Sequence, residues 1–212
     1  MHPLRRALAA RLSGLRRRRR IGDTPGVPSP AVALRRASSA DAAALAHNLI
    51  DAVADYPAFA PPGWSAPGVE AETEHLHAVL ADPDVWCTVA EAGPAVVGQV
   101  TVLPAARAPH PVDDPVLGHL SNLMVRRDFW GSGLARELHR AAVAGARERG
   151  LRTLRLFVAA GQARARRFYE REGWRVAGEP FDDPVPGLPM VEYRLRLAGA
   201  DESPPGPGSQ AP

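Results

Sequence analysis

Hydrophobic and polar residues follow two different periods along the chain, and together these predict the order of its strands and helices. Runs in which apolar residues recur at every second position predict strands, and runs in which they recur three or four positions apart predict helices. The predicted strands are 31–35, 86–90, 96–103, 117–125, 152–159, 174–177 and 190–197. The predicted helices are 41–53, 69–80, 131–149 and 163–171.

Turn and cap residues mark the ends of these elements. Ser38 or Ser39 is placed to cap the first helix, and Gly150 and Gly173 follow the last two helices, where glycine commonly ends a helix. The resulting order, β-α-α-β-β-β-α-β-α-β-β, predicts a mixed α/β sheet. The strands on either side of the helix 131–149 should be parallel neighbours joined by a right-handed crossover.

Charge divides the chain of 212 residues into unequal parts. Its net charge is +3, yet residues 1–20 alone carry +8, so the remainder carries −5. A stretch rich in proline and glycine follows the basic segment and ends near residue 30. We therefore expect a basic disordered arm and linker over 1–30, one domain over 31–198 and a disordered tail over 199–212.

Composition narrows the classes of function. No apolar run approaches the roughly 20 residues that a membrane span needs. Cys87 is the only cysteine, so no internal disulfide and no cysteine metal cluster can form, which suits a reducing cytoplasm. His75 and His77, two residues apart on a predicted helix, do not share a face, and we expect no metal site. The arm could bind nucleic acid, but the acidic domain has no basic recognition helix, so nucleic acid is not the expected partner.

A glycine-rich turn joins a predicted strand to the longest predicted helix. Gly131 and Gly133 can adopt backbone angles closed to other residues and let a ligand approach the backbone. The first turn of a helix also has free N–H groups and partial positive charge, which suit a pyrophosphate. On its own, a Gly-x-Gly at a helix start is often only a tight entry turn.

A second motif follows about 35 residues later, in the segment GQARARRFYEREGW. Together the two motifs resemble those of the GCN5-related N-acetyltransferase (GNAT) superfamily. The first is Arg/Gln-x-x-Gly-x-Gly/Ala after a strand, here residues 130–135 after 123–125. The second is Asn-x-x-Ala-x-x-x-Tyr and a glycine-aromatic pair, here Gln162, Ala165, Tyr169 and 173–174.

The resemblance implies an N-acetyltransferase with a mostly antiparallel sheet, a central parallel strand pair and helices on both faces. It implies that acetyl-CoA is the co-substrate and that a primary amine is the acceptor, attacked directly. The parallel strands should separate after Val125. Tyr169 would protonate the CoA thiolate. The residues it implies for acetyl-CoA binding are Leu123, Met124, Val125, Gly131, Ser132, Gly133, Leu134, Ala135, Arg136 and Gln162.

The general base is left open by the sequence. His119 lies on the strand that leads to the glycine turn, and an ordinary histidine titrates near neutrality, so it is a candidate base; a histidine in a strand is more often packed or exposed. The chain departs from the family pattern at Trp130, where Arg or Gln is usual, and at Gln162, where Asn is usual. Phe157 stands where some members carry a glutamate base.

The acceptor is not specified by these motifs. The region of Trp64, a loop over 104–115 expected to be mobile, and the segment 178–189 should form the acceptor mouth. A CoA-binding regulatory domain without catalysis is the alternative function, and the presence of Tyr169 argues against it. We expect a cytoplasmic protein, either a monomer or a homodimer.

Overall fold

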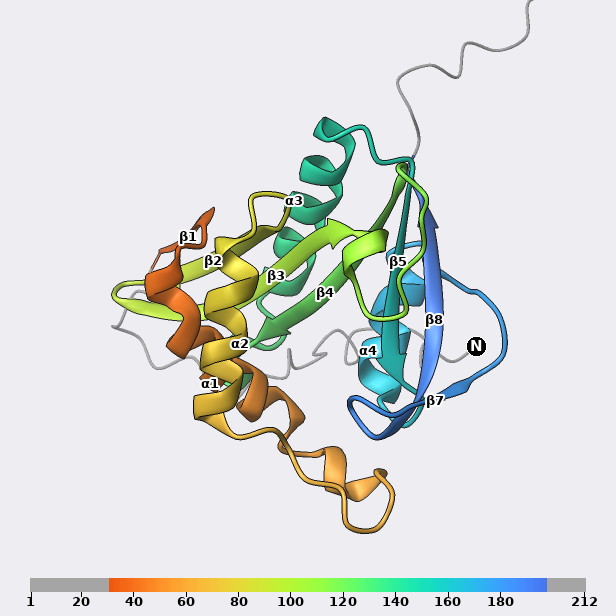
Figure 1. Ribbon diagram of the computed structural model, residues 1–212. Helices are drawn as coiled ribbons and strands as arrows, with labels where there is room; N and C mark the ends of the chain where they lie inside the picture. Colours follow the sequence, from red (N-terminus) through yellow and green to blue (C-terminus); the bar gives the residue numbers. More distant parts are fainter. Residues whose placement is uncertain (1–30, 198–212) are drawn as a thin grey trace, which may run out of the picture. The chain divides into compact units, whose positions relative to one another are not determined.

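The computed structural model describes residues 31–197, and these form one sheet with helices on both faces (Figure 1). The sheet has the strand order β1-β2-β3-β4-β5-β8-β6, and β7 also pairs with β8. The strands are β1 Val32–Arg36, β2 Trp86–Ala92, β3 Ala95–Pro104, β4 Leu117–Val125, β5 Thr153–Ala159, β6 Arg175–Val176, β7 Phe181–Asp183 and β8 Leu188–Arg196. Every pair is antiparallel except β4 with β5, which confirms the predicted fold class.

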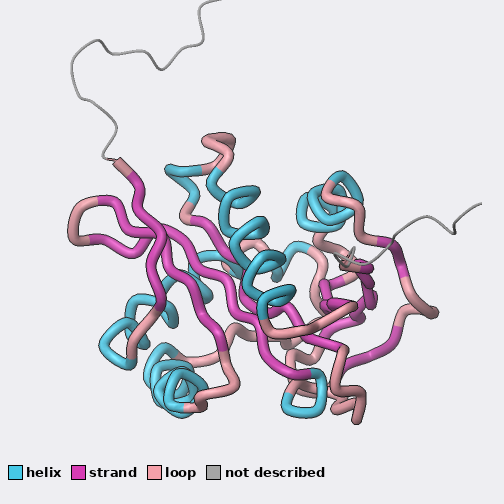
Figure 2. The backbone as a smooth tube through the Cα atoms, turned by 90° about the horizontal axis from the view of Figure 1, so that it is seen from above, coloured by secondary structure: helices cyan, strands magenta, loops and turns pink. Residues whose placement is uncertain are grey.

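Two pairs of helices cover the sheet. Figure 1 shows α1 and α2 in front of it and α3 and α4 behind it, and Figure 2 shows the same layers from above. The α-helices are α1 Ala42–Val53, α2 Val69–Ala81, α3 Leu134–Glu148 and α4 Ala163–Arg171. Short 3-10 turns lie at η1 Ser39–Asp41, η2 Tyr56–Ala58, η3 Ala105–Arg107 and η4 Arg127–Phe129. None of the described helices is long and apolar enough to cross a membrane.

The two faces of the sheet bury separate hydrophobic clusters. The larger cluster lies under α3 and α4 and includes Leu138 and Trp174, both with no exposed surface. The smaller cluster joins α1 and α2 to β2 through Leu45, Leu76 and Val89. Alternation along each strand supplies both clusters, because successive side chains point to opposite faces.

An ion-pair network fixes the start of α1. Ser38 donates its backbone N–H to Asp41 Oδ2 over 2.7 Å, and Arg35 donates from both terminal nitrogens to the same carboxylate. The hydrogen bonds from Arg35 lower the pKa of Asp41 to about 2. Ser38 caps the 3-10 turn η1, and Asp41 is the N-cap of α1 itself, so the cap predicted at Ser38 or Ser39 lies one turn before the α-helix.

The structure differs from the sequence prediction at three places. α3 begins at Leu134 rather than at residue 131, because Gly131 and Gly133 have φ values of 83° and 97°, which no right-handed helix contains. β7 lies in a segment predicted as loop. The loop expected to be mobile is instead tied down: buried Arg155 donates to the carbonyls of residues 105, 109 and 110. The predicted arm, 1–30, and tail, 199–212, lie outside the described residues.

The described residues of both hydrophobic clusters lie within 31–197. We therefore expect a chain shortened to begin at Ala31 to fold with an unchanged melting temperature, because no described core residue is lost. Calorimetry of the full and shortened chains tests this. A large decrease in melting temperature would show that residues 1–30 pack on the domain.

Candidate functional site: an opening between two parallel strands

β4 and β5 pair over only three residues and then separate. The paired positions are Leu117 with Thr153, Gly118 with Leu154 and His119 with Arg155, although β4 continues to Val125. The strands therefore part six residues earlier than expected. Beyond the last pair, the backbone groups on the facing edges have no strand partner in the described part of the chain and can bond a ligand.

A bulge in β4 lies beside this opening. Gln99 pairs with Met124 and Thr101 with Ser121, so β4 carries one more residue than β3 in this interval. Asn122, inside the bulge, has a φ of 52°. A bulge bends the strand that contains it. Bending β4 here is consistent with its departure from β5.

The glycine turn presents free N–H groups. Among the described residues, the backbone N–H groups of Gly131, Gly133 and Ala135 have no hydrogen-bond partner. A Cβ built on either glycine would meet no atom within 4 Å, so the space in front of the turn is open. Three donors at the positive end of α3 suit an anion such as a pyrophosphate, and the residues present therefore fit this part of acetyl-CoA.

Two predicted binding residues use their side chains within the turn region. Ser132 Oγ donates to the carbonyl of Phe129 over 2.7 Å and accepts from the N–H of Leu134. Arg136 Nε donates to Glu172 Oε1 over 2.8 Å. Both side chains stabilise the turn and its helix. Ser132 Oγ and Arg136 Nε are therefore engaged within the protein and are not free to bond an anion.

Trp130 lies between two arginines beside the turn. The Arg164 guanidinium is 3.3 Å from the centroid of the indole, and that of Arg127 is 5.0 Å from it. The indole N–H donates to the carbonyl of Val125 over 2.7 Å. The sequence prediction missed both arginines, because nothing local distinguishes them from the other 24 basic residues. Arg164 adds positive charge next to the free N–H groups, whereas Arg127 is also paired with Asp55 over 2.6 Å.

Tyr169 lies in the large hydrophobic cluster, with 8% of its surface exposed. Its ring packs against those of Phe168, Trp174 and Tyr193. Burial raises its pKa, and the neighbouring Tyr56 raises it further. The hydroxyl is consequently protonated at neutral pH and can act only as a donor of its proton.

A loop between α1 and α2 brings further aromatic residues to this tyrosine. Tyr56 stacks with Phe59 and Trp64 at centroid distances of 4.9 and 5.8 Å. Burial raises the pKa of Tyr56, and its hydrogen bond with the Gln162 side chain offsets part of this rise. A Cβ on Gly161 would lie 2.4 Å from the Phe59 ring, so the loop packs directly on the start of α4.

His119 is buried and neutral. Only 4% of the surface of His119 is exposed, and its Nδ1 has no hydrogen-bond partner in the described part of the chain. Burial and, to a smaller extent, the nearby Arg155 and His110 together lower its pKa to about 3. An imidazole that resists protonation this strongly is a poor acceptor for a proton from an ammonium group. These features argue against His119 as the base.

The three segments expected to form the acceptor mouth come together. Trp64 Nε1 donates to the carbonyl of Pro186 over 2.7 Å. His110 Nε2 lies 3.1 Å from Asp183 Oδ2. These two contacts join the α1–α2 loop and the 104–115 loop to the segment 178–189. β5 supplies Phe157 to the same region, where its ring contacts those of His110 and Phe181.

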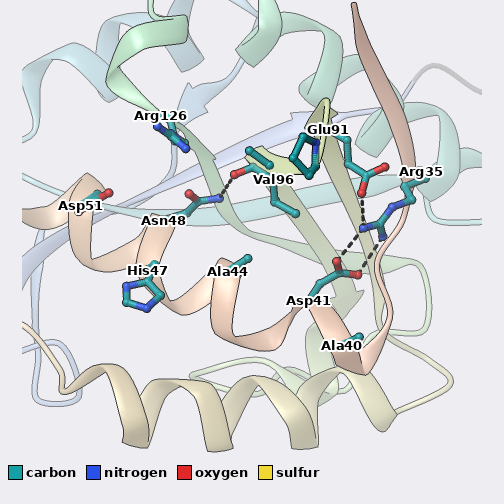
Figure 3. Close-up of a pocket in the computed structure, with 12 residues that line it drawn as sticks. Arg35, Ala40, Asp41, Ala44, His47, Asn48, Asp51, Glu91, Val96 and Arg126 are labelled. Carbon is teal, nitrogen blue, oxygen red and sulfur yellow. Dashed lines mark hydrogen bonds and ion pairs between the residues drawn. The ribbon is translucent and has the colours of Figure 1, made fainter. Parts of the chain in front are cut away.

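A separate hollow of about 400 Å³ lies between α1 and the β2–β3 hairpin (Figure 3). Its walls carry the Arg35–Asp41–Glu91 ion pairs and the Asn48 side chain, which donates to the carbonyl of Val96. Neither the glycine turn nor Tyr169 lines it. The residues predicted to bind acetyl-CoA therefore lie outside this hollow.

Residues 49–174 match the family model described as the acetyltransferase (GNAT) family, which is more than half of the chain. The chain belongs to this family and is an acetyltransferase. The family assignment agrees with the fold, the parallel strand pair and the glycine turn. A search of curated proteins gave no match.

Solved structures of acetyltransferases share the fold. An acetyltransferase from Thermus thermophilus is 21% identical, with a TM-score of 0.61 over 81% of this chain and 100% of that one. A ribosomal-protein-alanine N-acetyltransferase from Brucella melitensis is 23% identical, with a TM-score of 0.60 over 78% and 99%. An N-acetyltransferase from Staphylococcus aureus is 19% identical, with a TM-score of 0.61 over 79% and 99%.

The buried His119 predicts a pH dependence of stability. Its pKa is about 3 in the folded state and near 6.5 when unfolded, so between these values the unfolded chain binds one more proton. Stability therefore falls as the pH is lowered from 6.5 towards 3, by about 1.4 kcal/mol per pH unit from this group. Denaturant unfolding of the wild type and of His119→Gln at pH 4.5 to 6.5 measures the slope.

The slope should be shallower in His119→Gln, whatever the absolute stability of that variant. His139, whose pKa burial also lowers, keeps part of the slope in both proteins. His77→Gln is the matched control, because His77 is exposed on α2. Equal slopes in the wild type and His119→Gln would contradict the burial of a neutral imidazole at this position.

Proposed function

We propose that the protein transfers the acetyl group of acetyl-CoA to a primary amine by direct attack. The observation that carries the proposal is the separation of β4 from β5 beside a turn with three free N–H groups among the described residues. The opening offers strand-like backbone groups to an extended ligand, and the turn offers donors to a pyrophosphate. Acetyl-CoA, an extended arm with a pyrophosphate at one end, has matching chemistry.

The turn, the strand edge and two arginines each have a part in binding. The N–H groups of Gly131, Gly133 and Ala135 would hold the pyrophosphate, and Arg127 and Arg164 would add charge-assisted contacts to phosphate oxygens. The free edge of β4, with Leu123 at its centre, would hold the pantetheine arm. When bound, acetyl-CoA supplies a thioester whose carbonyl carbon an amine can attack.

The end of β4 is placed to stabilise the developing oxyanion. Met124 and Val125 pair with β3 on one side, and N–H groups alternate in direction along a strand. One of these two N–H groups therefore faces the opening. A preorganised backbone donor at this position would stabilise negative charge on the attacked carbonyl oxygen.

Tyr169 would protonate the departing thiolate. Its raised pKa keeps the hydroxyl protonated at neutral pH. A thiolate is a better leaving group than an alkoxide. Protonation of the sulfur by Tyr169 would therefore increase the rate without being indispensable. Its neighbour Tyr56 brings a polar group to a hydroxyl that otherwise lies among aromatic rings.

The acceptor would enter through the mouth formed by the three segments, each a different loop over the opening. The Brucella relative is by name an N-acetyltransferase of the alanine of a ribosomal protein, an amine acceptor consistent with the proposal. A panel of amines, from amino acids and polyamines to peptide N-termini, assayed for release of free CoA tests the function. Binding of acetyl-CoA without turnover on any of them would favour a regulatory domain.

Substitution of Gly133 tests the cofactor turn. Gly133→Val should raise the Kd for acetyl-CoA sharply, because a β-branched residue at a φ of 97° strains the turn that presents the N–H groups. Gly150→Val is the matched control: Gly150 lies at the other end of α3, also with positive φ, at 77°, and open space around it. Calorimetry measures both affinities, and an equal decrease in both variants would contradict the placement of acetyl-CoA.

Substitution of Tyr169 tests the proton donor. Tyr169→Phe should lower turnover by about 10²-fold, the lower end of the range for general acid catalysis. The ring still fills its space, so stability and acetyl-CoA affinity should barely change. Turnover on the best acceptor and acetyl-CoA affinity are measured together.

Tyr193→Phe is the matched control. Tyr193 is fully buried in the same cluster, and its hydroxyl donates to Glu170 and accepts from Arg166. Its loss should lower stability and leave turnover nearly unchanged. Unaffected turnover in Tyr169→Phe would mean that Tyr169 only packs in the core. A joint loss of turnover and affinity would mean that it supports the acetyl-CoA site.

A further inference from the structure

His110 has an unusual backbone conformation that the structure enforces. It lies in the loop between η3 and β4, and its φ of 52° falls in the left-handed region, which residues other than glycine rarely adopt. Arg155, 2% exposed, donates to the His110 carbonyl over 2.6 Å and to the carbonyl of Pro109 over 2.9 Å. Strained conformations of this kind persist only where surrounding contacts hold them, and they concentrate at functional sites.

The ring of His110 is also held in one orientation. Its Nε2 lies 3.1 Å from Oδ2 of Asp183, a residue that is 4% exposed and whose other oxygen accepts from the N–H of Val185. Phe157 and Phe181 approach the ring edge-on, at interplanar angles of 89° and 82°. The side chain nevertheless keeps 45% of its surface exposed.

The hydrogen bond to Asp183 determines which nitrogen can accept a proton. A carboxylate only accepts hydrogen bonds, so Nε2 carries the hydrogen and Nδ1 keeps its lone pair. Nδ1 has no hydrogen-bond partner among the described residues. The arrangement is that of a base held by a buried carboxylate, which also stabilises the imidazolium formed when Nδ1 takes a proton.

His110 lies at the strand opening, as its contact with Phe157 shows. Phe157 lies on β5 two residues beyond the last pair with β4, and therefore in the separated part. Its ring lies between two imidazoles: the centroid of His119 is 5.1 Å away and that of His110 is 5.5 Å away. His119 is buried, whereas His110 is exposed and belongs to the loop that forms one side of the mouth.

We propose that His110 is the general base that takes a proton from the acceptor amine, directly or through one water, and that Asp183 is its positioning residue. The inference rests on the acetyl transfer proposed above. An acceptor ammonium loses two protons while its nitrogen forms a bond to the acetyl carbon and the bond from that carbon to sulfur breaks. One proton passes to Nδ1 of His110 and then to solvent. The other returns to the Tyr169 oxygen and replaces the proton that Tyr169 gives to the sulfur.

The charged groups around His110 come from three strands. Asp183 on β7 faces Nε2 of the ring, and Arg155 on β5 donates to the His110 carbonyl. His119 on β4 stays neutral, since burial lowers its pKa to about 3. The rings of Phe157 and Phe181 carry no net charge. Among the described residues, Asp183 is therefore the one carboxylate in direct contact with the ring.

The pH profile of kcat/KM tests the proposal, measured by release of free CoA with the best amine of the panel and with the full chain. The wild type should lose activity on the acid side through one ionisation. His110→Gln should lose that ionisation and about 10²-fold in rate at pH 7. The deficit should shrink at high pH, where the amine is deprotonated without a base. Acetyl-CoA affinity should change less than twofold.

Two further variants separate proton transfer from folding. Added imidazole should restore part of the activity of His110→Ala, because the side chain is exposed and leaves an accessible space. Asp183→Asn should lower kcat more than it changes KM, because the ring loses the carboxylate that holds its orientation. His77→Gln, exposed on α2, is the matched control and should keep the wild-type profile.

The outcomes distinguish this inference from the proposed function. A wild type that acetylates amines while His110→Gln keeps the same pH profile overturns the assignment of the base alone. So does a uniform loss at every pH that accompanies a lower melting temperature and resists imidazole. A wild type that acetylates no amine overturns the proposed function and this inference together.

Discussion

The pair formed by His119 and Arg155 is the point on which the rest of the structure depends. On one side of it, β4 and β5 are parallel neighbours, which keeps the sheet continuous and places α3 and α4 on one face. On the other side the strands diverge and leave free backbone edges. The Arg155 side chain then holds the 104–115 loop by three carbonyls. This pair is thus the last one between β4 and β5, and the opening begins beyond it. The Arg155 side chain of the same pair also positions a loop over the opening.

The two ends of the opening differ in chemistry, yet they are physically connected. The turn end has free N–H groups and arginines, and the mouth end has aromatic rings. Asp55, at the start of the α1–α2 loop, lies 2.6 Å from Arg127 beside the turn. The same loop packs on Gly161 through Phe59 and bonds Pro186 through Trp64. One loop therefore contacts both ends of the opening.

Local patterns predicted the elements well where the pattern repeats over several residues. The strand 117–125 and the helix 163–171 agree with the structure at both ends. The start of α3 was wrong because a Gly-x-Gly is compatible with a helix start, while the φ values of both glycines exclude it. β7 was missed because three residues between two prolines show no periodicity. The sequence thus predicted the family and the turn, and the roles of the named site residues stay predictions.

Contacts between residues far apart in the chain were not predicted from the sequence. His110 and Asp183 are 73 residues apart, and the only local signal is a histidine in a proline-rich loop. Arg164 and Trp130 likewise meet only because β4 and β5 are neighbours that lead into adjacent helices. Such pairs depend on the crossover and on loop paths, which no periodicity specifies.

Environment, rather than residue type, separates the two histidines beside Phe157. His119 lies on a central strand, where burial and a nearby guanidinium penalise the charged form and no acceptor among the described residues meets Nδ1. His110 lies on a loop, where one nitrogen faces a buried carboxylate and the ring edge meets solvent. A base must be stable in both protonation states and must be reached by its substrate. Of these two, only the loop histidine has an exposed side chain, although the strand histidine is the one candidate that the sequence analysis named.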